Sequence, residues 1–225
     1  MTDHPAAHTA AEPLGAASAD ELAGCPDDVL IRRLQAGDLD AFEALFARYR
    51  TPIYRTAYAM TGDPHFAEEV LQDTFARAYQ RRAILRTDVS PLGWLHRVAL
   101  NLCYSRLDRR RLKAEPIDDS EAGLVRDGDG EPPEHAERME LQAIVRDGIA
   151  ALAPKHRSVV VLYYLHGFSL QETSTLLDVR LGTVKSRLHY ALRSLRLQLE
   201  GDRRFGGAYI PPAPAQHVEA EARPT

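Results

Sequence analysis

The sequence predicts an all-α protein of two small helical domains joined by a flexible acidic linker. Apolar residues recur at three- and four-residue spacing through residues 27–113 and again through 135–200, which is the period of a helix with one buried face. Helix start signals, in which a capping residue precedes proline, occur in the first of these stretches. Residues 114–134 have no such period and are acidic, with glycine and proline, so they are predicted to form the linker.

The two ends of the chain are predicted to be disordered tails. Residues 1–26 are rich in Ala, Asp, Glu and Pro and contain no aromatic residue, although weak helix near Asp20 is an alternative. Residues 201–225 are rich in glycine and proline. Neither segment has the apolar periodicity that a packed helix needs.

The charge of the chain is segregated along the sequence. The 225 residues carry a net charge of −4, which by itself argues against nucleic-acid binding. However, residues 27–113 and 141–200 each carry +4, whereas 114–140 carry −8 and 1–26 carry −4. Two basic blocks separated by an acidic one allow nucleic-acid contact by both helical domains.

Several classes of function lack their sequence signals. The two cysteines, Cys25 and Cys103, form neither a CxxC pair nor a disulfide framework, and the nine histidines lack metal-ligand spacing. We find no Gly-rich phosphate loop and no nucleophile–base constellation, so no catalytic residue is predicted. The N-terminus does not resemble a signal peptide, and the longest apolar run, Val159–Leu165, is too short to span a bilayer. The cytoplasm is the simplest compartment.

The first domain is predicted to begin with helices over residues 27–61. Leu30, Ile31 and Leu34 form a short apolar stripe that ends at Gly37, and Asp38 or Asp40 can cap the next helix. Thr51-Pro52 has the form of an N-cap followed by proline, which predicts a separate helix from there to Gly62.

Asp63-Pro64 repeats this signal and predicts a helix that continues to about Arg82. Its inward face is expected to consist of Ala67, Val70, Leu71, Thr74, Phe75, Ala78 and Tyr79. Glu69, Gln72, Asp73 and Ala76 fall on another face. Such a patch of carboxylate and amide is either a solvated surface or a docking site.

A basic helix is predicted from Leu92 to about Lys113, after a loop over residues 83–91. The residues of this helix that can pack against the core are Trp94, Leu95, Val98, Leu102 and Leu107. The residues predicted to face outward are His96, Arg97, Asn101, Tyr104 and the cluster Arg109, Arg110, Arg111 and Lys113. Cations at a helix C-terminus suit the helix dipole, and an aromatic, an amide and several cations on one helix also suit nucleic acid. Both interpretations stay open.

The second domain is predicted to begin with a helix that has one apolar stripe, formed by Met139, Leu141, Ile144, Val145, Ile149 and Leu152. Pro154 starts the next helix. The run Val159–Leu165 is apolar nearly all round, which predicts the buried core helix of this domain. Gly167 suits a helix end that needs left-handed φ.

Residues 167–199 are predicted to form a helix-turn-helix. Ser169 and Glu172 make a capping box for a short helix to about Leu177, and Asp178 begins a tight turn. The next helix buries Leu181, Val184, Leu188, Ala191, Leu192, Leu195 and Leu199. Its opposite face carries Arg180, Thr183, Lys185, Ser186, Arg187 and Tyr190. This face suits the DNA major groove, and a helical hairpin with a solvated basic face is the alternative.

Together, four segments resemble a bacterial sigma factor of the extracytoplasmic-function type, in the sigma-70 family. AEEVLQDTFARAY at Ala67–Tyr79 resembles region 2.2, which binds the clamp coiled coil of core RNA polymerase. Pro91–Arg111 resembles regions 2.3 and 2.4, which melt and read the −10 element. Leu152–Ser169 resembles the start of region 4, and Leu181–Arg196 resembles its −35-reading helix, in which GTVKSRLH is the most specific piece. The order of the segments also fits the family.

This resemblance implies three sets of site residues. Core polymerase is expected to bind Glu69, Gln72, Asp73 and Phe75. The −10 element is expected to contact Trp94, Arg97, Asn101, Arg109, Arg110 and Arg111, with a place in the core as the alternative for Trp94. The −35 element is expected to contact Arg180, Thr183, Lys185, Ser186, Arg187 and Tyr190.

The resemblance also implies binding partners, although the sequence departs from the family pattern at several positions. The implied partners are the β and β′ subunits of core polymerase, promoter DNA and an anti-sigma factor, with no cofactor, no metal and no membrane insertion. The acidic linker would cross the basic RNA path of the polymerase. The sequence differs from the usual family pattern at three places: Leu100 replaces Arg, Thr173-Ser174 replace Ile-Ala, and Asp178 replaces a Gly that is often found in the turn. These differences affect which promoters the resemblance implies.

A free-standing helix-turn-helix regulator with an N-terminal sensor is the alternative function. That interpretation leaves the carboxylate face at Glu69, Gln72 and Asp73 unexplained, and the sequence offers no signature of a ligand pocket. Dependence on core polymerase distinguishes the two interpretations.

Overall fold

The computed structural model describes residues 19–112 and 133–199, and every regular element in these two ranges is helical. Most are α-helices, with one 3₁₀ turn and one π turn, and no strand occurs in either range. The prediction of an all-α protein is therefore confirmed. The predicted linker, apart from its last two residues, and the C-terminal tail lie outside the described residues.

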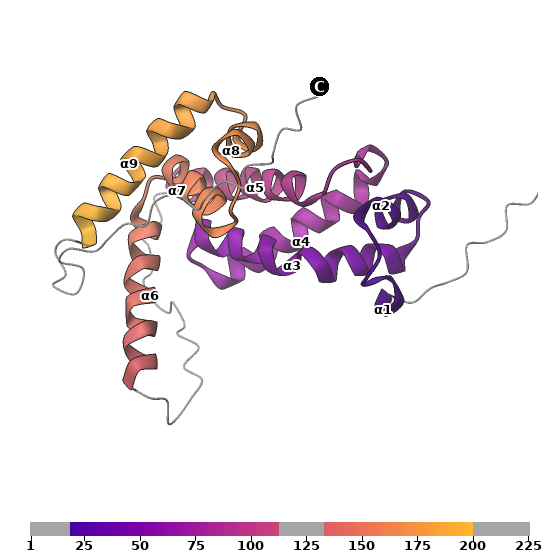
Figure 1. Cartoon of the computed structure of the whole chain (residues 1–225), viewed down its shortest axis with the longest axis horizontal. Helices are drawn as coiled ribbons and strands as arrows, with labels where there is room; N and C mark the ends of the chain where they lie inside the picture. Colours follow the sequence, from indigo (N-terminus) through magenta and orange to yellow (C-terminus); the bar gives the residue numbers. More distant parts are fainter. Residues whose placement is uncertain (1–18, 113–132, 200–225) are drawn as a thin grey trace, which may run out of the picture.

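The N-terminal half is a packed group of helices, drawn from indigo to magenta in Figure 1. Its core is formed by α3 (Leu39–Thr61), α4 (Pro64–Gln80) and α5 (Leu92–Leu112), which pack against one another. The short α1 (Ala19–Leu22) and α2 (Asp27–Gln35) cover α3 near its start, and the 3₁₀ turn η1 (Arg82–Ile84) follows α4. Asp38 and Asp63 cap α3 and α4 through their carboxylates, as expected of these residues.

The predicted helix start at Thr51-Pro52 is wrong, because α3 runs through it without a break. Proline removes one backbone donor, but the buried face continues on both sides of it, from Leu45 and Tyr49 to Ile53 and Ala57. Continuous burial of this stripe outweighs the loss of one helical hydrogen bond.

The ordered structure also begins earlier than the predicted boundary at residue 27. Leu22, at the end of α1, is buried, and Arg48 of α3 donates hydrogen bonds to the carbonyl oxygens of Ala23 and Cys25 and to the carboxylate of Asp27. Helix near Asp20, the alternative for this segment, is what the structure contains. Residues 1–18 lie outside the described part of the chain.

The C-terminal half contains the helix-turn-helix. Its elements are α6 (Pro133–Ala151), α7 (Pro154–Val160), the π turn η2 (Val161–Leu165), α8 (Leu170–Leu177) and α9 (Leu181–Leu199). The capping box of Ser169 and Glu172 opens α8, and Asp178 ends it in the left-handed region with φ of 54°. Figure 1 shows α6 extending away from the packed helices.

The two halves pack against each other, with α8 lying on α5 and with α6, α7 and η2 contacting α3. One apolar cluster joins Ile53, Leu100 and Cys103 of the first half to Val161 and Leu162 of the second. Of the run Val159–Leu165, predicted to be a buried core helix, Val159–Tyr163 are buried, whereas Tyr164 and Leu165 are half-buried and the run is a π turn from Val161 onward. Part of it packs into the core of the first half instead of serving the second domain alone.

This packing overturns part of the prediction for α5. His96 was expected to face outward, yet its side chain is completely buried, and Tyr104 is half-buried between the two halves. The helix has packing partners on several sides, α3 and α4 on one and α8 on another, so a single apolar stripe does not describe it. None of the described helices is long and apolar enough to cross a membrane.

Candidate functional site

The outer face of α4 presents the predicted carboxylate and amide side chains. The side chains of Glu69 and Asp73 are 59% and 49% exposed, and Gln72 between them is exposed. These positions lie on one side of the helix because Val70, Leu71 and Thr74 are turned into the core. The structure therefore brings three of the four predicted core-binding residues onto one accessible surface.

Phe75 does not share that surface. Its side chain is 4% exposed and makes edge-on contacts with Phe46 and Phe42, at ring-centroid distances of 4.8 and 6.3 Å. This burial agrees with the inward face predicted for Phe75, and the packed ring helps to position α4 against α3. A contact of Phe75 with core polymerase stays a prediction.

Arg106 of α5 is a component of this surface that the sequence did not reveal. Its guanidinium donates hydrogen bonds to the carboxylates of Glu69 and Asp73, at 3.1 Å for Asp73, and it lies over the ring of Phe66 with Cζ 4.8 Å from the centroid. These carboxylates raise the pKa of Arg106, Glu69 most strongly. Because Arg106 lies 37 residues from Glu69, no spacing rule could have paired them.

The predicted −10-reading residues lie along α5 but are not equally accessible. Arg97, Asn101 and Arg109 are exposed, Trp94 and Arg110 are half-buried, and the side chain of Arg111 lies outside the description. Trp94 packs against the main apolar cluster, so the core alternative for it has structural support. Arg97 pairs with Asp178 of the helix-turn-helix at 3.5 Å.

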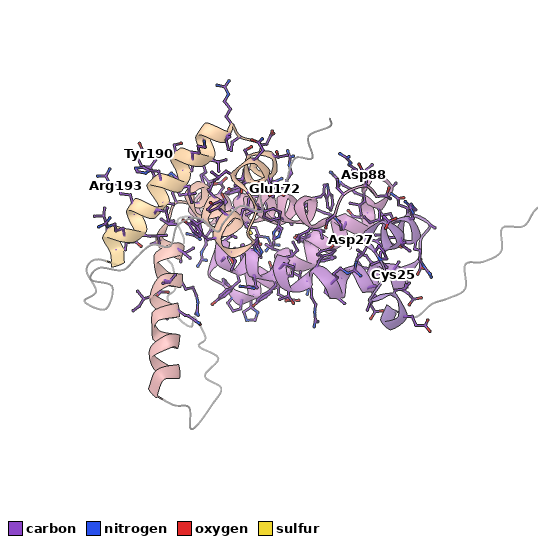
Figure 2. The ribbon with its side chains drawn as sticks, viewed as in Figure 1. Cys25, Asp27, Asp88, Glu172, Tyr190 and Arg193 are labelled. Atoms are coloured by element: carbon purple, nitrogen blue, oxygen red, sulfur yellow. The ribbon has the colours of Figure 1, made fainter. Side chains whose placement is uncertain are left out.

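The predicted −35-reading face of α9 is open to solvent. Arg180, Lys185 and Ser186 are exposed, and Tyr190 is 55% exposed on the outer side of the helix, where Figure 2 labels it beside Arg193. Thr183 and Arg187 are half-buried. Val184 and Ala191 are fully buried behind this face, so the packing holds the polar side chains outward.

A buried polar cluster joins the two halves at α3, α5 and the end of η2. The Thr56 hydroxyl lies 2.9 Å from Nδ1 of His96 and 2.7 Å from Nε2 of His166, and it reaches the carbonyl oxygen of Pro52 at 3.1 Å. If the hydroxyl donates to that carbonyl, its oxygen accepts one N–H from each imidazole. We call Thr56, His96 and His166 the hydroxyl–imidazole cluster.

Both imidazoles of this cluster are held neutral. Burial lowers the pKa of His96 to about 3 and that of His166 to about 4, with a further contribution from His166 to the first and from Arg55 to the second. A second proton on His96 would reside on Nε2, which has no hydrogen-bond partner in the described structure. The cluster therefore resists protonation while it stays buried.

Acid should for this reason destabilise the packed fold. Above about pH 7 both imidazoles are neutral in the folded and in the unfolded chain. Below the ordinary pKa of 6.5 the imidazoles of the unfolded chain become protonated, whereas those of the folded chain stay neutral until the pH nears 4. We expect the free energy of unfolding to fall by up to about 1.4 kcal/mol per pH unit for each imidazole between about pH 6.5 and 5.

Urea unfolding at a series of pH values measures this effect. A His166→Gln variant should lose part of the pH dependence, whereas His65→Gln, at an exposed position on α4, should retain all of it. A wild-type curve that is flat between about pH 7.5 and 5.5 would contradict the neutral, buried cluster.

The described residues contain no group of three or more His, Cys, Asp or Glu side chains that could hold a metal ion. The candidate surfaces described above are an acidic face on α4 and basic or polar faces on α5 and α9. Such surfaces bind macromolecules by charge and shape.

Comparison with known proteins agrees with this geometry. Sigma-70 region 2 matches residues 45–113, and sigma-70 region 4 matches residues 148–197. The ECF RNA polymerase sigma factor SigW of Bacillus subtilis is 35% identical over 178 residues, which cover 75% of this chain and 94% of that protein. SigL of Mycobacterium tuberculosis, also an ECF sigma factor, is 32% identical over 171 residues, covering 73% and 92%.

A solved structure is similar as well. The structure of CnrH in complex with the cytosolic domain of CnrY aligns with a TM-score of 0.58 at 25% identity, covering 78% of this chain and 98% of that one. The similarity extends over both halves of the fold described above.

Proposed function

The chain belongs to the ECF sigma factors of the sigma-70 family, and from this premise we propose that it binds core RNA polymerase and directs it to promoters with matching −10 and −35 elements. In this role it takes part in DNA melting and transcription initiation without catalysing a reaction of its own. It acts where core polymerase is, in the cytoplasm.

The observation that carries the proposal is the separation of three faces on one helical scaffold. An exposed acidic and amide face on α4 is available for a basic partner, and the polar face of α9 follows a well-capped helix-turn-helix. The exposed cations of α5 lie on a third surface. We assign these faces to core polymerase, the −35 element and the −10 element.

An anti-sigma factor is part of the proposal. The relative CnrH was solved bound to the cytosolic domain of CnrY, and ECF sigma factors resemble this chain over most of its length. We propose that a protein partner of this kind holds the chain inactive until a signal releases it.

Run-off transcription with purified core polymerase tests the function. Core polymerase with the full chain should produce transcripts from a set of genomic promoters that core polymerase alone does not transcribe. Promoter selection should be lost when the −35 or the −10 element is replaced. If the chain binds promoters as tightly without core polymerase as with it, the alternative of a free-standing regulator is correct.

A further inference from the structure

A pocket with a volume of about 510 Å³ lies where α6 meets the C-terminal part of α3 and the π turn η2. Its apolar lining consists of Ala59, Val145, Ile149, Val160, Val161 and Leu165. Val145 is 39% exposed, so the apolar surface of this pocket is open to solvent. A cavity of this size is large enough to receive several side chains of a peptide segment. We call this site the α3–α6 pocket.

Two tyrosine rings add an aromatic surface to this lining. Tyr58 comes from α3 and Tyr164 from η2, and both residues are half-buried. Tyr58 is stacked on Tyr54, with the ring centroids 6.2 Å apart and an interplanar angle of 3°, which restrains its ring. The remaining polar lining consists of the exposed residues Arg55, Gln142 and Arg146. The pocket therefore offers aromatic faces together with groups that donate hydrogen bonds.

This combination fits a segment in the polyproline II conformation. Such a segment makes no internal hydrogen bonds, so its carbonyl oxygens are free to accept from donors in the pocket. Proline has no backbone N–H, so a proline-rich segment presents acceptors with few donors. Proline-rich segments bind grooves lined by aromatic side chains, because their conformation is already formed and little entropy is lost. The chemistry of the pocket thus indicates a proline-rich peptide as its ligand.

The chain itself carries a segment of this kind. Residues 209–214 read Tyr-Ile-Pro-Pro-Ala-Pro, in which Pro211 and Pro214 have the spacing of a PxxP motif. No other two prolines of the sequence are three residues apart. Tyr209 and Ile210 place an aromatic and an aliphatic side chain directly before the prolines, which suits the apolar lining of the pocket. These residues lie outside the described part of the chain.

The end of α9 brings this segment within reach of the pocket. A Cβ atom added at Gly148 of α6 would lie 3.2 Å from Cδ2 of Leu195 and 3.3 Å from Oε1 of Gln198, so the end of α9 packs against α6. Ile149, the next residue, lines the pocket, and α6 stands between the end of α9 and α3 in Figure 1. The segment begins ten residues after the end of α9. Ten extended residues span up to about 35 Å, whereas a helix with its side chains is about 10–12 Å across, so the segment can pass around α6.

We propose that the α3–α6 pocket is a peptide-binding site, which residues 209–214 of the same chain occupy in a polyproline II conformation. The apolar side chains of the segment pack against Tyr58 and Tyr164, and its carbonyl oxygens accept hydrogen bonds from Arg55 and Arg146. The pocket shares no residue with the faces that we assign to core polymerase and promoter DNA.

The tether between α9 and the segment makes the binding effective. It supplies an effective concentration of about 1 mM, so an intrinsic dissociation constant of about 100 μM is enough to keep most of the pockets filled. A proline-rich segment of another protein therefore binds the pocket only in competition with the chain's own segment.

Photo-crosslinking in the full chain tests the position of the segment. Tyr209 is replaced by benzoylphenylalanine, a photoreactive aromatic residue, and irradiation should join it to residues 142–150 or 160–165 of the same chain. His217, replaced in the same way, lies beyond the segment and should give a several-fold lower yield of these products. Equal yields from both positions, or no product with the pocket from position 209, would overturn the inference. Covalent dimers as the main product would overturn it too, because the segment would then fill the pocket of a second copy.

A fluorescent peptide with the sequence of residues 207–216 measures whether the pocket is occupied. A full-chain variant with Pro211→Gly, Pro212→Gly and Pro214→Gly should bind this peptide about tenfold more tightly than the wild type, because its own segment no longer competes. Pro224→Gly changes a proline outside the segment and should bind as the wild type does. Equal affinity of the wild type and the triple variant would show that the pocket serves a partner's segment instead, which would overturn the inference. The absence of binding to the triple variant would also overturn it.

Two further substitutions, made in the triple variant, locate the bound peptide. Val145→Arg puts a charged side chain into the apolar lining and should abolish peptide binding. Ala151→Arg, at an exposed position of α6 outside the pocket, makes the same charge change and should leave the affinity unchanged. Circular dichroism should show equal helix content in both proteins, because both positions are accessible to solvent. Equal peptide binding by the two proteins would place the site elsewhere and overturn the inference.

Discussion

Replacing Asp73 by Arg and Gln72 by Ala should abolish binding to core polymerase while leaving the chain folded. Asp73 lies on the exposed face of α4, and Arg in its place would turn an attractive contact with a basic clamp helix into a repulsive one. A reversal of this kind at an interface costs several kcal/mol, which corresponds to a loss of affinity of about 100-fold or more.

The fold should tolerate this change. Asp73 and Gln72 are off the buried stripe of α4, and the ion pair that Asp73 makes with Arg106 is partly exposed. An exposed pair of this kind contributes about 0–1 kcal/mol, and Glu69 remains as a partner for Arg106. Circular dichroism and thermal unfolding should therefore stay close to the wild type.

Asp88→Arg is the matched control. Asp88 is an exposed carboxylate that pairs with an arginine, Arg86, and it lies at the end of the molecule far from α9 (Figure 2). The variant makes the same charge change outside α4, so its affinity for core polymerase should stay near the wild type. Binding to immobilised core polymerase measures all variants, and wild-type affinity of the Asp73→Arg, Gln72→Ala protein would show that the docking face is elsewhere.

Reversing the charge of Arg109 and Arg110 should impair strand opening more than it impairs recruitment of the polymerase. Both residues lie near the C-terminal end of α5, on a helix that we assign to the −10 element. If each contacts a phosphate, the plot of log binding constant against log salt concentration should become shallower by about two units in the double Glu variant. The yield of open promoter should fall by about tenfold or more.

The double Lys variant is the control for this experiment. Lysine keeps the positive charge near the phosphates and at the C-terminus of the helix, so both DNA contact and helix stability should persist. Gel-shift affinity of the holoenzyme and open-complex yield are measured on the same promoter. An unchanged yield with the Glu variant would favour the alternative in which these arginines serve the helix dipole alone.

Local signals predicted the helix-turn-helix well. The capping box at Ser169 and Glu172 and the tight turn at Asp178 depend on residues only a few positions apart, so their geometry can be read from the sequence. The same is true of Asp63-Pro64, which caps and starts α4. The identical logic failed at Thr51-Pro52, where burial on both sides of the proline kept α3 continuous.

Contacts between distant segments could not be predicted in this way. Thr56 and His166 are 110 residues apart, and nothing near His96 indicates that it would be buried by a second half of the chain. Arg106 illustrates the same limit, since it joins the acidic face from another helix. The burial of Phe75, by contrast, agrees with the periodicity, which predicted that this residue lies on the inward face of α4. Helical periodicity assigns a residue to a face, but which faces meet is decided by the tertiary packing.

The central claim is that this chain opens promoter DNA only in combination with core polymerase. Permanganate reactivity of unpaired thymines in the −10 element measures opening directly, with core polymerase alone, the full chain alone and the two together. Reactive thymines should appear only when both are present, and the Asp73→Arg, Gln72→Ala variant should not produce them. Reactivity with the chain alone, or none with the reconstituted complex at promoters that it occupies, would contradict the claim.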